Sequence, residues 1–373
     1  MRSKKIILLL FLFNVILVKS QITEKNLITK KIKFLSDNKK QTTLDALIDS
    51  TVFDFIQSPQ NCGLSIGVIK DEKSIFYNYG ETKRGGNNLP SQNTIYEIGS
   101  ISKTFCGILL AYGVTESKIN LEDDIRNYLP EKYPNLETHD QVIKVKNLAN
   151  HTSGLPRLPE NIFIQPNFDT LNPYKNYDKQ KVFDYLKTIT LTSEPGKIYS
   201  YSNLGMGLLG MILEKVYANR FDELIKEKIC TVNGMNNTAV NLATEQQILF
   251  ADGYNADGKN TPHWDLGALT AAGGIKSSTS DMVKYLQYNL DEKDSVTKLA
   301  HQSTFNNGTN IALAWHIVKT KMGNELIWHN GGTFGFSSFC GFIKEKKCAL
   351  IVFSNSGTNV DYIGLSILKF LQK

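Results

Sequence analysis

The chain has 373 residues with a formal net charge of +6, and 41% of its residues are hydrophobic. This length accommodates one large domain or two closely packed lobes with a substantial core. Basic residues do not cluster among aromatic ones, which argues against a nucleic-acid-binding surface. The six histidines show no His-x-His or His-x-x-x-His spacing, so neither a metal site nor a cofactor is predicted.

The N-terminus has the features of a secretory signal peptide. Basic residues precede an apolar run over 6–18, which is too short for a comfortable membrane span. Cleavage after Ser20 would lower the formal charge by four, to +2, so most of the basicity belongs to the leader. We therefore predict export, to the periplasm or as a secreted protein, with 1–20 as signal peptide and 21–41 as a flexible segment. An uncleaved anchor is the alternative, because Lys19 is an unusual neighbour of a cleavage site.

The five cysteines lie far apart in the chain, and no two of them form a Cys-x-x-Cys motif. An exported protein could pair some of them, but an odd number leaves at least one free or paired with another chain. We interpret most of them as small buried apolar residues.

Beyond the leader, the pattern changes from strands to helices and back again. Alternating apolar residues over 64–68 and 75–79 predict a hairpin that follows a helix over 44–56. Helical spacing then recurs in a loop-rich region, at 105–114, 181–188, 204–216, 221–229 and 281–288. Strand patterns return at 311–318, 325–329, 336–343 and 349–354, before an amphipathic helix over 362–371.

This order predicts an α+β fold in which residues 42–373 form a single domain. The early and late strands would share one antiparallel sheet flanked by helices, in an α/β sandwich lobe of about 42–100 and 305–373. Residues of about 101–304 would form a mainly helical lobe beside it. A cleft between two such lobes is where polar catalytic groups usually gather.

Ser100-Ile101-Ser102-Lys103 is the most informative segment, because it joins the predicted hairpin to an apolar helix. A serine in the first turn of a helix lies at the positive end of the helix dipole, which favours negative charge on its oxygen. A lysine three residues later lies on the same face, and partial burial would lower its pKa enough to accept the serine proton. Three other Ser-x-x-Lys copies, which begin at Ser36, Ser295 and Ser366, lack this Gly-Ser entry and are interpreted as surface residues. We predict Ser100 as the nucleophile and Lys103 as its base.

Two later segments carry polar groups suited to the same chemistry. Tyr201, on the loop before a predicted helix, could relay protons, and the amide of Asn203 would point the same way. His329-Asn330-Gly331-Gly332 ends an apolar strand, where glycines let a substrate lie along the strand edge. The N–H groups of Ser100 and Gly332 could together bind an oxyanion. Taken singly, a packed tyrosine ring and an edge-strand histidine are ordinary explanations for these segments.

A second serine pattern competes for the role of nucleophile. Gly63-Leu64-Ser65-Ile66-Gly67 fits the Gly-x-Ser-x-Gly pattern of α/β-hydrolases, which requires a strand, a sharp turn and a helix in that order. Ser65 lies within a predicted strand that is followed by a second strand. We therefore interpret Ser65 as a structural residue.

Considered together and in order, these segments resemble the serine penicillin-recognising enzymes, specifically class C β-lactamases and low-molecular-mass DD-peptidases. The resemblance extends over about residues 60–355 and implies a β-lactamase/transpeptidase-like fold with a five-stranded antiparallel sheet. Besides the nucleophile segment, it includes 121–130, the run Leu-Ala-Asn-His-Thr-Ser-Gly-Leu-Pro at 148–156, Tyr201-Ser202-Asn203-Leu204-Gly205 and Trp328-His329-Asn330-Gly331-Gly332. In this family the loop that resembles 148–156 is structural.

The resemblance implies the catalytic roles. Ser100 would attack the substrate carbonyl and carry the acyl group. Lys103 and Tyr201 would share the proton transfers, and which of them is the base in each half-reaction is disputed across such enzymes. The N–H groups of Ser100 and Gly332 would form the oxyanion hole.

The substrate-binding residues implied by the resemblance are Asn203, His329, Asn330 and Gly331. Asn203 would hydrogen-bond the substrate's amide side chain, and His329 would face the substrate carboxylate and tune Tyr201. Most class C β-lactamases have lysine where this chain has His329, whereas related DD-peptidases and esterases often have histidine. Because an unperturbed histidine is mostly neutral near pH 7, carboxylate recognition is less assured here than in an enzyme with lysine.

The predicted function is that of an exported serine hydrolase that opens β-lactam amides through a Ser100 acyl-enzyme, an activity associated with antibiotic resistance. One alternative is a D-alanyl-D-alanine carboxypeptidase or endopeptidase acting on peptidoglycan, which His329 favours; another is a β-lactamase-fold carboxylesterase. A non-catalytic penicillin-binding sensor is the last, although no output domain is recognisable. The expected partner is a small substrate, without nucleic acid or stable membrane insertion after leader removal, and the protein is expected to be a monomer.

Overall fold

The computed structural model describes residues 34–373, which form one unit. The predicted signal peptide over 1–20 and most of the segment 21–41 therefore lie outside the described residues. Within 34–373, no helix is long and apolar enough to cross a membrane.

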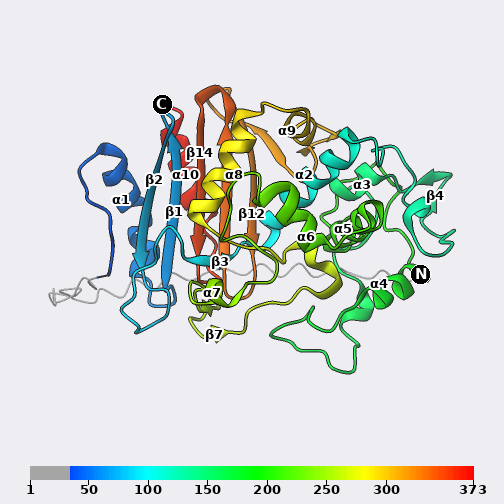
Figure 1. The fold of residues 1–373 in the computed structure, drawn as a ribbon, viewed down its shortest axis with the longest axis horizontal. Helices are drawn as coiled ribbons and strands as arrows, with labels where there is room; N and C mark the ends of the chain where they lie inside the picture. Colours follow the sequence, from blue (N-terminus) through cyan, green and yellow to red (C-terminus); the bar gives the residue numbers. More distant parts are fainter. Residues whose placement is uncertain (1–33) are drawn as a thin grey trace, which may run out of the picture. The chain divides into compact units, whose positions relative to one another are not determined.

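An antiparallel sheet of eight strands organises the molecule (Figure 1). The N-terminal hairpin pairs directly with the C-terminal strand β14, so the predicted sheet of early and late strands is confirmed. In spatial order the strands are β2 (Lys73–Gly80), β1 (Gly63–Lys70), β14 (Cys348–Ser354), β13 (Ser337–Ile343), β12 (Glu325–Gly332), β11 (His316–Lys319), β10 (Asn310–Ile311) and β9 (Phe305–Asn306).

The sheet has eight strands rather than the five that were expected. The strand predicted over 311–318 is interrupted after Ile311, and Ala314 within the interruption has a positive φ of 62°. The neighbouring Trp315 is fully buried, so the bend places a large ring in the core and separates β10 from β11. The two-residue β9 then pairs with β10 at the edge.

Apolar side chains point alternately to the two faces of the sheet because helices cover both faces. In β14, Phe353 belongs to a hydrophobic cluster that includes α8 (Thr279–Asp291). Its neighbour Val352 belongs to a second cluster, which includes α1 (Thr43–Gln57) and α10 (Asp361–Leu371). The α+β class predicted from the sequence is confirmed.

The region between the early and late strands is mainly helical, as predicted. Its other helices are α2 (Ser102–Thr115), α3 (Val145–Ala149), α4 (Lys179–Leu186), α5 (Asn203–Tyr217), α6 (Phe221–Ile225), α7 (Thr244–Gln247) and α9 (Ser295–Ala300). α2 is buried along most of its length and packs against α5 and α9. The helix predicted over 221–229 is divided, since α6 ends at Ile225 and a π-helical turn over Lys226–Cys230 follows.

Three short antiparallel pairs complete the strands. They are β3 (Ile95–Glu97) with β8 (Lys276–Ser278), β4 (Glu137–Thr138) with β5 (Gln141–Val142), and β6 (Gly253–Tyr254) with β7 (Asn260–Thr261). The first pair matters for the site, because β3 leads directly into the segment that carries Ser100.

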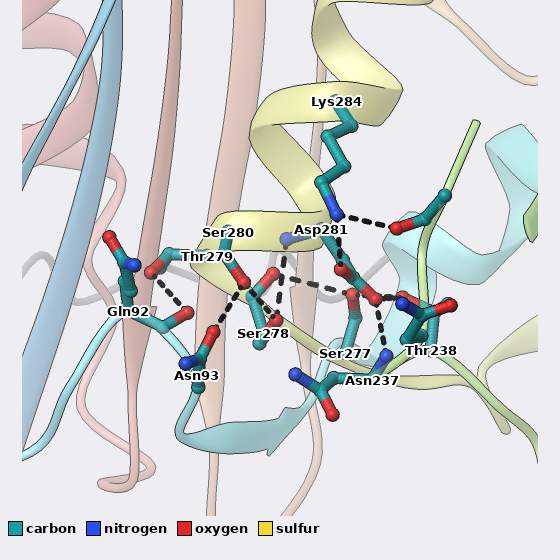
Figure 2. Close-up of polar contacts among 12 residues, drawn as sticks. Gln92, Asn93, Asn237, Thr238, Ser277, Ser278, Thr279, Ser280, Asp281 and Lys284 are labelled. Atoms are coloured by element: carbon teal, nitrogen blue, oxygen red, sulfur yellow. Dashed lines mark hydrogen bonds and ion pairs between the residues drawn. The ribbon is translucent and has the colours of Figure 1, made fainter.

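A polar network fixes the start of α8 beside β8 (Figure 2). Ser278 caps the helix by accepting a hydrogen bond from the N–H of Asp281 at 3.3 Å. Asp281 is 1% exposed, and it accepts bonds from the Asn237 N–H at 2.6 Å and the Thr238 hydroxyl at 2.9 Å. Lys284 lies 3.5 Å from its other oxygen. These bonds satisfy a buried carboxylate and connect the loop of Asn237 and Thr238 to α8.

Ser65 lies inside β1, as the sequence predicted. Its hydroxyl is fully buried, donates to Asn78 Oδ1 at 2.8 Å and is 2.8 Å from the Tyr96 hydroxyl. Because β2 follows β1, the strand, turn and helix of a nucleophile elbow are not formed here. All five cysteines lie in the described part of the chain, where each is buried and none forms a disulfide.

Candidate active site

Ser100 stands on a short 3-10 turn, Gly99–Ile101, between β3 and α2. The sequence predicted it inside the first turn of the helix, but α2 begins two residues later. Gly99 has a φ of +50°, and a Cβ there would come within 2.6 Å of the Gly332 nitrogen. Glycine is therefore required for the close approach of β12 to the turn that carries Ser100.

Lys103 lies next to the Ser100 hydroxyl. Its Nζ is 3.0 Å from Ser100 Oγ and donates to the carbonyl oxygen of Ala272 at 2.5 Å. The lysine is fully buried; burial first, and then the charge of Arg157, hold its pKa well below the ordinary value. A neutral amine that donates to Ala272 keeps a lone pair, and this lone pair can accept the serine proton.

Tyr201 lies beside the same pair of residues. Lys103 Nζ is 4.7 Å from the centroid of the Tyr201 ring. Burial raises the pKa of Tyr201, while the nearby Ser100 hydroxyl and the charge of Arg157 act in the opposite direction. The phenol is therefore protonated at neutral pH and can serve as a proton donor. The structure thus brings Ser100, Lys103 and Tyr201 together.

The His-Thr-Ser-Gly-Leu-Pro segment holds Tyr201 in place. The next residue, Ser202, caps α5 by accepting from the Gly205 N–H at 2.9 Å, and its hydroxyl donates to the Pro156 carbonyl at 2.7 Å. The Ser202 N–H donates to His151 Nδ1 at 3.2 Å. The His151 ring packs against Tyr201, with centroids 4.5 Å apart. This loop, expected to be structural, fixes a residue of the site.

Asn203 begins α5 and offers an unused acceptor. Its Nδ2 donates to the Tyr174 hydroxyl at 3.3 Å, whereas its Oδ1 is buried without a hydrogen-bond partner. A buried carbonyl oxygen without a partner is costly, so a substrate N–H would satisfy it. Asn203 itself does not line the groove that gives access to Ser100, so the amide-binding role that the resemblance implies stays a prediction.

The glycine pair at the end of β12 lies against the turn of Ser100. A Cβ on Gly331 would come within 2.2 Å of the Ile98 carbonyl oxygen and 2.8 Å of the Ser100 nitrogen. Gly332 contacts Gly99 in the same crossing. The strand end and the turn therefore meet backbone to backbone, and the oxyanion hole of Ser100 and Gly332 stays a prediction.

His329 is buried close to Lys103 and His151, and it does not itself line the groove that gives access to Ser100. Its side chain is 1% exposed, and its Nδ1–H donates to the Asn330 carbonyl oxygen at 2.5 Å. Burial holds the pKa of His329 well below its ordinary value, with further lowering from His316, whose ring centroid is 5.4 Å away. A neutral imidazole beneath the strand cannot supply the cation that a substrate carboxylate needs. The structure does not bring His329 to the groove surface.

An open groove of about 950 Å³, which includes space shared with solvent, gives access to Ser100 and Tyr201. The strand side of the groove includes Asn330, Gly331 and Gly332. The Asn330 amide nitrogen donates to Asp361 Oδ2 at 2.7 Å, behind the groove. Within residues 34–373 no group of histidines, cysteines and carboxylates is arranged to hold a metal ion.

Sequence reasoning missed two residues of the site. Arg157 lines the groove, and its guanidinium lies 5.0 Å from the Tyr201 ring centroid. His316 in β11 also lines the groove and stacks on Trp328, with centroids 4.9 Å apart. The position of Arg157, directly after the recognised Leu-Pro of the loop, was an available signal. His316 had none, because only strand pairing places it there.

A family model described as Beta-lactamase matches residues 48–371. The chain belongs to the Beta-lactamase family. The resemblance to serine penicillin-recognising enzymes inferred from the sequence is therefore confirmed.

Two relatives and one solved structure illustrate the range of this family. A β-lactamase of Pseudomonas fluorescens is 27% identical and covers 84% of this chain and 94% of its own length. The D-alanyl-D-alanine-carboxypeptidase/endopeptidase AmpH of Escherichia coli (strain K12) is 25% identical and covers 78% of each chain. A crystal structure of a class C β-lactamase is 25% identical with a TM-score of 0.77, and it covers 88% of this chain and 98% of its own.

Proposed function

We propose that the protein is a serine hydrolase that opens β-lactam amides through an acyl-enzyme on Ser100, in the manner of a class C β-lactamase. The observation that carries the proposal is the 3.0 Å contact between Ser100 Oγ and the buried Lys103 Nζ. A lysine with a lowered pKa beside a serine forms a nucleophile with its own base. Membership of the Beta-lactamase family supports the same reading.

In the acylation step, Lys103 accepts the Ser100 proton while Oγ bonds to the carbonyl carbon of the lactam. The electron pair of the C=O bond moves to oxygen, where the N–H groups of Ser100 and Gly332 would stabilise the charge. The carbonyl then re-forms, the ring C–N bond breaks, and Tyr201 donates its proton to the leaving nitrogen. Lys103 returns the serine proton to Tyr201. The raised pKa of Tyr201 supports its role as proton donor.

In the deacylation step, water attacks the acyl carbon and transfers a proton to the Lys103–Tyr201 pair. The tetrahedral intermediate collapses, the bond to Ser100 Oγ breaks, and the serine oxygen takes that proton back. The product is the ring-opened acid. Asn203 Oδ1 would bind the N–H of the substrate's amide side chain in both steps.

The direct test is intact-mass spectrometry with benzylpenicillin, together with hydrolysis of nitrocefin. Ser100→Ala is expected to form no adduct and to lose turnover. Ser65→Ala is the matched control, because Ser65 lies in a similar motif but is fully buried in β1. An adduct that persists in Ser100→Ala, or one that disappears in Ser65→Ala, would refute the assignment of the nucleophile.

The second candidate function is a D-alanyl-D-alanine carboxypeptidase or endopeptidase that acts on peptidoglycan. It is favoured by the AmpH relative and by histidine rather than lysine at position 329. The lifetime of the benzylpenicillin adduct separates the two functions. Rapid return to the native mass indicates a β-lactamase, and a lasting adduct on Ser100 indicates the peptidase.

Export with removal of residues 1–20, a single catalytic domain over 42–373 and a monomeric state belong to the same proposal. N-terminal sequencing of the mature protein and light scattering test them. A mature chain that retains residues 1–20, or a stable dimer, would contradict the corresponding part.

A further inference from the structure

The charge of the groove comes from one side chain. Arg157 is exposed and lines the groove, and within residues 34–373 no other lysine or arginine and no carboxylate lines it. Lys103 lies close by, but it is fully buried and its amine is engaged by Ser100 and Ala272. A ligand in the groove therefore meets a single permanent cation.

The backbone of Arg157 is fixed by the start of α5. Its carbonyl oxygen accepts hydrogen bonds from the N–H groups of Asn203 at 2.9 Å and Leu204 at 3.3 Å. The guanidinium lies 5.0 Å from the centroid of the Tyr201 ring, within the range of a cation–π contact. Both ends of the residue are thus held beside the reacting groups.

The guanidinium of Arg157 has no hydrogen-bond or ion-pair partner among the described residues. The other three arginines in that part of the chain are all engaged. Arg84 donates to the carbonyls of Pro59 and Gln60, Arg126 pairs with Asp124 and Glu137, and Arg220 pairs with Asp222. A fork of five N–H donors without a partner, held over the mouth of a groove, is suited to bind a carboxylate with two parallel bonds.

The side chains of His329 and Asn330 cannot take this role. His329 is buried and its Nδ1–H is used by the Asn330 carbonyl oxygen. The Asn330 amide nitrogen is used by Asp361, whose carboxylate would also repel an anion. The position at which this family usually presents a lysine is therefore without a free donor side chain.

We propose that Arg157 is the specificity residue that binds the carboxylate of the substrate, in place of His329. The inference rests on the proposed serine hydrolase function and assigns the substrate class: β-lactams or peptides with a free carboxylate near the bond that is cleaved. The carboxylate would lie on the helical side of the groove, next to Tyr201, rather than along β12.

The test compares acylation of Ser100 by benzylpenicillin with acylation by its methyl ester, followed by intact mass. Arg157→Met is expected to lower the ratio of the two rate constants by about tenfold or more, the scale of one charge-assisted hydrogen bond. Arg157→Lys keeps the charge but not the fork, so its ratio should lie between those of wild type and Arg157→Met. Arg220→Met is the matched control, because Arg220 is paired at the start of α6 and does not line the groove.

The ratio of the two acylation rate constants shows whether Arg157 binds the substrate carboxylate or only holds Tyr201 in position. If Arg157 only supported Tyr201, its loss would slow both substrates equally, and an unchanged ratio in Arg157→Met overturns the proposal. Salt provides a second measurement on the wild-type protein: rising ionic strength should slow benzylpenicillin more than its ester, and equal slowing overturns the proposal. Failure of the proposed function is distinguishable, because the wild-type protein would then neither form a Ser100 adduct with either compound nor hydrolyse it.

Discussion

The imidazole of His151 lies against the ring of Tyr201, with centroids 4.5 Å apart, and its Nδ1 accepts a hydrogen bond from the N–H of Ser202 at 3.2 Å. His151 is 1% exposed and has a φ of +60°. It therefore holds both the side chain of Tyr201 and the peptide that follows it. We regard His151 as a positioning residue for the phenol.

His151→Leu should lower kcat for nitrocefin by about tenfold or more, because Tyr201 would lose a packing partner and Ser202 an acceptor. His151→Asn should recover part of the loss, since an asparagine oxygen can accept from Ser202 and asparagine tolerates positive φ. Steady-state kinetics, corrected for the folded fraction in thermal melts, checks this. Equal kcat in the leucine variant and wild type would show that His151 has a purely structural role.

Tyr201→Phe removes only the phenol hydroxyl. If that hydroxyl donates the proton to the leaving nitrogen, turnover should fall by a factor on the order of 10² or more. The melting temperature should change little, because the ring and its contacts with His151 and Arg157 remain. Wild-type turnover in this variant would remove Tyr201 from the proton transfers.

Gly331→Ala should unfold at a lower temperature than wild type. The new Cβ would come within 2.2 Å of the Ile98 carbonyl oxygen, a backbone atom, so the end of β12 must move away from the turn of Ser100. The cost is about 1–3 kcal/mol of unfolding free energy, as for other overpacked sites.

Gly332→Ala is the matched control for this change. Its Cβ would meet the Phe336 carbonyl oxygen at 3.6 Å, an ordinary contact, so its stability should stay within roughly 0.5 kcal/mol of wild type. Denaturant unfolding of both variants measures the difference. Equal losses at the two neighbouring glycines would show that the crossing with the Ser100 turn is not the cause.

Stability should fall as the solution is acidified below the ordinary histidine pKa. Burial lowers the pKa of His151, His316 and His329, in the case of His316 from 6.5 to about 4. The unfolded chain therefore binds protons that the folded protein does not. The contribution is complete above about pH 6.5 and declines toward pH 4, with the unfolding constant rising about tenfold per pH unit for each such histidine.

His316→Asn removes one of the three histidines that bind a proton only in the unfolded chain. The stability of this variant should therefore depend less steeply on pH than that of wild type. His139→Asn is the matched control, because the His139 side chain is 82% exposed. His139 has a positive φ, which asparagine tolerates. Thermal melts between about pH 8 and about pH 4 compare the slopes. The same slope in His316→Asn and wild type would contradict the assignment.

Local patterns predicted the elements well where the apolar period was regular. The alternation around Ser65 gave β1, and helical spacing after Ser100 gave α2. The strand predicted over 311–318 failed because burial of Trp315 bends the chain between two short strands. A turn with a positive φ at alanine, as at Ala314, carries no sequence signal of the kind that glycine gives.

The sequence by itself determined that the side chains of Ser100 and Lys103 lie within reach of each other, because both stand on one short segment whose helical geometry fixes their separation. It also determined the order of strands and helices, since hydrophobic period is a local property. Only the tertiary structure decided the charge of the groove. Arg157 reaches Tyr201 and His329 is buried because loop and strand packing select which side chains meet solvent, and burial lowers the pKa of the imidazole.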